Sequence, residues 1–137
     1  MSDVVMAGNV AISSAGGGIS VCENAILVLG TGVSVEGNSA GVGGGAAIHV
    51  NASLTSVGGA HFRYNEAVAS AATPSGLRGT GGGIMCIACR VVDGVQVVDN
   101  KAAKGGGFGA VNHRASLDTG CMLSNVSLSN NSASLFG

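Results

Sequence analysis

The chain has 137 residues, of which 9% are charged and 46% apolar, with a formal net charge of −1. This balance excludes the basic surface of a nucleic-acid-binding protein, and an aromatic content of 3% excludes the stacking platforms of a single-strand binder. The apolar content argues against disorder, yet no apolar run reaches the roughly 18 residues of a transmembrane helix.

One short pattern occurs five times: an apolar residue, two variable residues, Asn, one variable residue and Ala. The pattern asparagines are Asn9, Asn38, Asn65, Asn100 and Asn131. Their spacings are 29, 27, 35 and 31 residues. A repeat at such a period is typical of a solenoid, in which one structural unit is stacked on the next.

The expected strands follow this repeat in chain order. An apolar stretch at residues 3–6 precedes Asn9, and the first complete repeat then has alternating stretches at residues 19–21, 27–29 and 33–35. Alternation of apolar and variable residues is typical of half-buried strands. The second repeat, from residue 43 to residue 67, aligns with the first without a gap.

Glycine triplets at residues 16–18, 43–45, 81–83 and 105–107 separate one repeat from the next. Glycine permits positive φ and close approach of neighbouring backbones. We assign structural roles at these corners to Gly17, Gly18, Gly44, Gly45, Gly82, Gly83, Gly106 and Gly107. The pattern Asn suits a corner because it tolerates left-handed backbone, and because its amide can bond the same amide above and below.

Two columns of apolar residues precede the pattern Asn and are expected to point inward. The column five places before it holds Val4, Val33, Ala60, Val95 and Val126. The column three places before it holds Met6, Val35, Phe62, Val97 and Leu128. A further inward column, directly after the triplets, holds Ile19, Ala46, Ile84 and Phe108.

These features predict an all-β fold, a right-handed parallel β-helix of about four coils with three short strands per coil. Residues 1–137 form a single repeat region, expected to be a piece of a longer solenoid with neighbouring coils at both ends. Asn38 and Asn65 should then lie directly one above the other. Residues 68–80 interrupt the repeat and carry the only proline, Pro74. We expect a disordered bulge there, although inserted loops of solenoids often carry recognition.

Phe62-Arg63-Tyr64-Asn65, together with Gly-Gly-Ile at residues 17–19 and 82–84, resembles the repeats of chlamydial polymorphic outer membrane proteins. Other apolar residues replace Phe in the remaining four copies. The resemblance implies a surface-exposed or secreted β-helical protein, located at the cell surface, in the outer membrane or outside the cell, and used in adhesion. Its partner would be a host-surface, cell-wall or glycan ligand.

A search for catalytic groups favours a chain without its own active site, cofactor or metal. Paired carboxylates of a glycosidase must face each other, whereas Glu36 and Asp99, which could approach one edge, are separated by a whole repeat. The leading hypothesis is therefore a non-enzymatic structural or adhesive repeat region. The alternative is a set of non-catalytic coils from a polysaccharide-degrading, pectin-lyase-like β-helix enzyme.

Cys86-Ile87-Ala88-Cys89 has the spacing of a redox or metal motif. Core packing is the preferred interpretation, because free cysteine often acts as a small hydrophobe, and a local disulfide is the alternative. A zinc site would require His49, His61 or His113 beside the thiols, and these histidines occupy unrelated repeat positions. Cys22 and Cys121 also fall outside the repeat. Asn-x-Ser sequons at Asn51, Asn125 and Asn130 matter only in a secreted eukaryotic protein.

Overall fold

The computed structural model describes residues 3–111 and 121–136, and the regular elements of these residues are all strands. The prediction of an all-β chain is confirmed for this part of the molecule. Each strand pairs in parallel with a strand from a neighbouring repeat. The described residues include no helix long and apolar enough to cross a bilayer.

The strands form three sheets, here called sheets A, B and C. Sheet A contains β1 (Val4–Ala7), β4 (Ile26–Leu29), β5 (Val33–Glu36), β8 (Ser53–Arg63), β11 (Val91–Val98), β14 (Met122–Ser124) and β15 (Ser127–Ser129). Sheet B contains β2 (Val10–Ala15), β6 (Ser39–Val42), β9 (Glu66–Ala67), β12 (Lys101–Lys104) and β16 (Ser132–Phe136). Sheet C contains β3 (Ile19–Val21), β7 (Ala46–Ile48), β10 (Ile84–Ile87) and β13 (Phe108–Val111).

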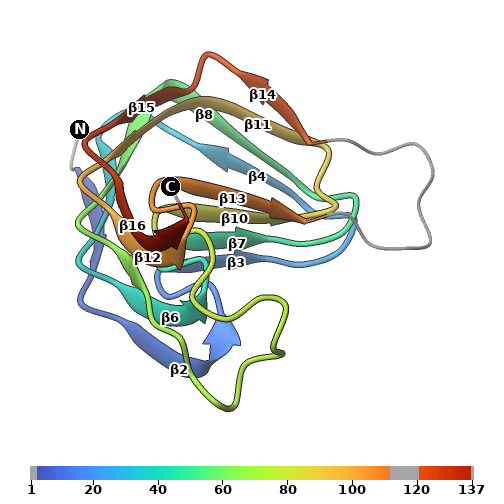
Figure 1. The fold of residues 1–137 in the computed structure, drawn as a ribbon. Helices are drawn as coiled ribbons and strands as arrows, with labels where there is room; N and C mark the ends of the chain where they lie inside the picture. Colours follow the sequence, from blue (N-terminus) through green and yellow to red (C-terminus); the bar gives the residue numbers. More distant parts are fainter. Residues whose placement is uncertain (1–2, 112–120, 137) are drawn as a thin grey trace.

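The chain visits the three sheets in a fixed order, A then B then C, and begins that order again in each repeat. Figure 1 shows sheet A across the top, sheet C through the centre and sheet B at the lower left. The pattern Asn lies at the corner between sheets A and B, and the glycine triplet lies at the corner between sheets B and C. Each corner sequence therefore marks a change of sheet.

The assignment of stretches to sheets differs from the sequence-based expectation. The stretches at residues 27–29 and 33–35 both belong to sheet A, where β4 and β5 pair with the single long strand β8. The third sheet is formed instead by the residues after the pattern Asn, such as β6. Those strands are short and rich in alanine and serine, so they lack the alternation that identifies a strand.

The core lies between sheets A and C, and the two columns before the pattern Asn supply part of its sheet A side, together with residues such as Leu54 and Val92. Val35 pairs with Phe62, and Phe62 pairs with Val97, so the largest of these side chains is held between two valines. All three are fully buried. The outermost members of the columns, Val4 and Leu128, are 50% exposed, since a described strand covers each on one side only.

The inserted segment at residues 68–80 forms turns without a strand of its own and makes several contacts. Arg78 donates from Nε to the carbonyl of Thr73 at 2.7 Å and from Nη2 to the carbonyl of Ala71 at 3.0 Å. Backbone bonds from Val68 and Gly79 attach both ends of the segment to β6. Thr73 is buried, and its hydroxyl has no hydrogen-bond partner among the described residues.

Candidate functional site

The pattern asparagines form a continuous ladder of side-chain hydrogen bonds through the molecule. In each step, the backbone N–H and the Nδ2 of one Asn both donate to Oδ1 of the Asn in the next repeat. The Nδ2-to-Oδ1 distances from Asn9 to Asn131 are 2.9, 3.0, 3.0 and 2.9 Å. Asn38, Asn65 and Asn100 are buried. Asn38 and Asn65 thus lie in adjacent layers, in direct contact.

Asn65 shows how a buried amide is satisfied without water. Its Oδ1 accepts from the backbone N–H and from Nδ2 of Asn38, both at 3.0 Å. Its own Nδ2 donates to Oδ1 of Asn100 at 3.0 Å and to the carbonyl of Val35 at 2.9 Å. Every donor and acceptor of the side chain is used, so the amide carries no unpaired polar group into the core.

The left-handed backbone at this corner belongs to the residue before the pattern Asn, which corrects the role expected for Asn itself. The preceding residues have φ between 52° and 68°. They are Gly8, Gly37, Tyr64, Asp99 and Asn130. The Asn is selected for its amide, whereas the position before it tolerates glycine, tyrosine or a polar residue at some conformational cost.

The three glycines of each triplet have different roles. The first glycine has positive φ, as at Gly43 with φ 62°. The third glycine lies against the ladder: a Cβ on Gly45 would be 2.9 Å from Nδ2 of Asn65. The second and third glycines, to which the repeat assigned structural roles, are therefore positions of close approach, as at Gly44 and Gly45. The first glycine of each triplet, which was not among the predicted structural residues, is where the chain turns. The glycine triplet in the sequence could have identified it.

Glu36, one of the two candidate carboxylates, is engaged by a residue of the next repeat. Oε2 of Glu36 accepts from Nε of Arg63 at 2.6 Å and from the hydroxyl of Ser34 at 3.2 Å. The hydrogen bond from Arg63 holds the pKa of Glu36 below its ordinary value. In register, Glu36 aligns with Arg63, and Arg63 aligns with Val98, so a strand lies between Glu36 and Asp99. Glu36 is thus suited to remain ionised, not to act as a general acid.

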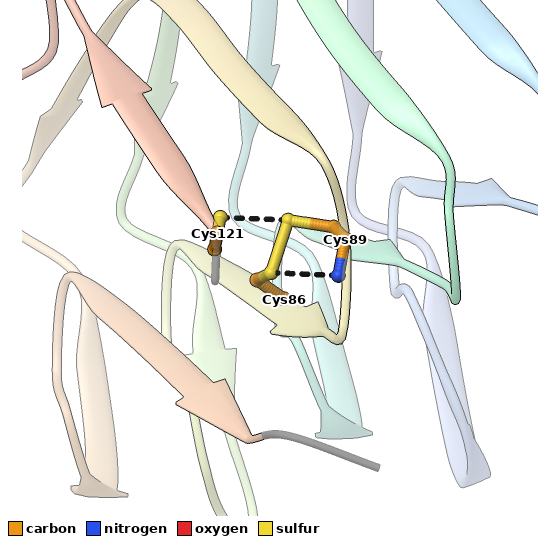
Figure 2. Close-up of side chains that lie close together, drawn as sticks. All are labelled: Cys86, Cys89 and Cys121. Carbon is orange, nitrogen blue, oxygen red and sulfur yellow. Dashed lines mark hydrogen bonds between the residues drawn. A yellow bond between two sulfur atoms is a disulfide. The ribbon is translucent and has the colours of Figure 1, made fainter. Parts of the chain in front are cut away.

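Three cysteines from two repeats meet at the corner between β10, β11 and β14. Cys86 and Cys89 are buried and form a disulfide. The structure therefore contains the local disulfide that was the alternative to core packing of free cysteines. Sγ of the free Cys121 lies 2.7 Å from Sγ of Cys89, as Figure 2 shows. Burial raises the pKa of the Cys121 thiol to about 11. The contact between Cys121 and Cys89 could not be predicted from the sequence, because Cys121 does not follow the repeat.

The histidines do not join this cluster. The described group of three metal-ligating side chains consists of Cys86, Cys89 and Cys121. His49 lies beside Ser20, with its Nε2 3.4 Å from the Ser20 hydroxyl, and His61 is exposed on β8. His113 lies outside the described residues.

A shallow groove of about 430 Å³ runs across the outer edge of sheet B, beside the start of the inserted segment. Its walls come from β9, β12 and β16 and from Val68 and Ala69. Glu66 and Lys101, which are register partners in adjacent strands, are both exposed at this groove. The groove thus combines small apolar side chains with one acidic and one basic group.

Neither a family model, nor a curated protein, nor a solved structure matches this chain.

Proposed function

We propose that this chain is a right-handed parallel β-helix that serves as a structural or adhesive repeat region of a surface-exposed or secreted protein. The observation that carries the proposal is the asparagine ladder. Each of its steps joins residues 27 to 35 positions apart through the same pair of hydrogen bonds. A chain that returns to the same place at every repeat presents long, regular outer faces, which suits a scaffold.

The resemblance of Phe62–Asn65 to repeats of polymorphic outer membrane proteins supports the adhesive part of the proposal. The ion pair between Glu36 and Arg63, which joins adjacent repeats, also suits a scaffold.

The groove beside the inserted segment is the surface that we assign to ligand contact. The exposed Val68 and Ala69 offer small apolar surface to the face of a sugar ring, while Glu66 and Lys101 can bond its hydroxyl groups. Host-surface and cell-wall glycans share this chemistry. The adhesive ligand is therefore proposed to be a glycan.

The proposal is tested by binding of the purified chain to immobilised cell-wall and host-surface glycans. Ala69→Arg places a long side chain at the groove and should lower retention at least about tenfold, which corresponds to about 1.4 kcal/mol. Val10→Arg is the matched control, since Val10 is 65% exposed on β2 of the same sheet and does not line the groove.

Retention of the wild-type chain and of Val10→Arg, with loss for Ala69→Arg, supports the proposal. Equal retention of all three proteins, or no retention of the wild-type chain, contradicts adhesion through this groove. Turnover of an acidic polysaccharide would favour the enzyme hypothesis instead.

A further inference from the structure

We propose that Cys86, Cys89 and Cys121 form a zinc-binding site when the Cys86–Cys89 disulfide is reduced. One ligand, Cys86, lies in β10, Cys89 follows in the turn after that strand, and Cys121 precedes β14 in the following repeat. A zinc ion at this position would join two successive repeats at their corner.

The three sulfur atoms are already close to the arrangement that zinc requires. They all lie within 4.8 Å of one another. Tetrahedral zinc holds thiolates at about 2.3 Å, which places the sulfurs about 3.8 Å apart. Small side-chain rotations after reduction are therefore sufficient, and the backbone can keep its path.

The turn between Cys86 and Cys89 also favours a thiolate ligand. The backbone N–H of Cys89 points at Sγ of Cys86, at an N-to-S distance of 3.1 Å. Ala88 has φ 49°, which brings this N–H round to the sulfur. Hydrogen bonds to an ionised acceptor are stronger than those to a neutral one, so this contact stabilises a bound thiolate more than a thiol.

The surroundings of the cluster favour zinc among the thiophilic ions. Thiolates select soft ions such as Zn²⁺ and Cu⁺. Cys86 and Cys89 are part of the hydrophobic core, with Cys121 packed against it. A buried net charge is costly, and three thiolates leave one negative charge around Zn²⁺ but two around Cu⁺. Water completes the coordination, as it does in three-ligand zinc sites.

Zinc and the disulfide exclude each other. A dithiol reductant supplies two electrons and two protons to the Cys86–Cys89 bond and is itself oxidised to a disulfide. Three thiols result, and zinc displaces one proton from each as the three Zn–S bonds form. The oxidised protein retains only the Cys121 thiol in this cluster and should not bind the ion.

The test is a titration of the full chain with Co²⁺ and then Zn²⁺ under nitrogen, after reduction with a phosphine reductant that is then removed. We expect one ion per chain, with thiolate-to-cobalt charge-transfer absorption that zinc abolishes. Cys121→Ser should weaken binding at least about 100-fold, because it removes one of three ligands. Cys22→Ser is the matched control, because Cys22 is free and exposed and lies outside the cluster.

Three results would overturn the proposal. They are no charge-transfer absorption in the reduced wild-type chain, equal affinity of Cys121→Ser and wild type, and equal binding before and after reduction. Titration of free thiols establishes the redox state of each sample. Far-ultraviolet circular dichroism of each reduced protein shows that a loss of binding does not come from unfolding.

Discussion

Removal of one buried amide from the ladder should cost far more stability than removal of an amide at its end. Asn65→Ala takes away the acceptor of the Asn38 backbone N–H and of one Asn38 Nδ2 proton, and the donor to the Val35 carbonyl. Each buried group left unpaired costs about 1–3 kcal/mol. The expected loss is about 3–9 kcal/mol, a large share of the roughly 5–15 kcal/mol that stabilises a typical domain.

Asn9→Ala is the matched control. Asn9 is exposed, and its Nδ2 donates to Oδ1 of Asn38 at 2.9 Å, as Nδ2 of Asn65 donates to Oδ1 of Asn100. After the substitution, Oδ1 of Asn38 keeps the bond from the backbone N–H of residue 9, which is 3.0 Å long in the wild type. The expected loss is below about 1 kcal/mol.

Urea unfolding followed by circular dichroism measures both changes as free energies of unfolding, provided that the slopes agree among the variants. The reasoning is refuted if Asn65→Ala costs less than about 1 kcal/mol, or no more than Asn9→Ala. Such a result would mean that water or local relaxation replaces the lost bonds.

Four further substitutions, one of them a control, test other features of the fold. Gly45→Ala places a Cβ 2.9 Å from Nδ2 of Asn65 and should lower the urea midpoint strongly, whereas Gly30→Ala, with open space around its Cβ, should leave the midpoint nearly unchanged. Tyr64→Gly relieves a φ of 56° at an exposed position and should stabilise the protein by about 1 kcal/mol; a lower midpoint would argue against strain there. Because Arg63 holds the pKa of Glu36 below 4.5, the stability from this pair is full above that pH and is lost as the pH falls through the depressed pKa. Glu36→Gln should remove this part of the acid sensitivity, and identical pH profiles would contradict it.

The sequence was most informative where one residue type repeats at one angular position. The columns that contain Val35, Phe62 and Val97 were predicted to point inward, and these residues are buried register partners. The spacing of Asn38 and Asn65 predicted adjacent layers, and their side chains are hydrogen-bonded at 3.0 Å. Such columns can be recognised in the sequence because every layer imposes the same packing requirement.

The features that sequence reasoning missed depend on a single layer or on backbone geometry. Cys121 meets Cys89 across 32 residues, and nothing in the repeat pattern predicts that contact. Sheet B was missed because strands such as β9, which has two residues, are too short to show alternation. In the inserted segment, Arg78 donates to two nearby carbonyls, and no repeated position in the sequence predicts these bonds.

The central claim, that the chain returns to the same place one layer higher in each repeat, is tested most directly by cross-linking. His61 and Gln96 are exposed register partners on β8 and β11. Parallel strands lie about 4.8 Å apart, within the range of about 4.4–6.8 Å that a disulfide spans. His61→Cys combined with Gln96→Cys should therefore cross-link rapidly on mild oxidation. His61→Cys combined with Val98→Cys, two residues out of register at about 8 Å, should not. Equal cross-linking of the two pairs, or none in the registered pair, would contradict the account.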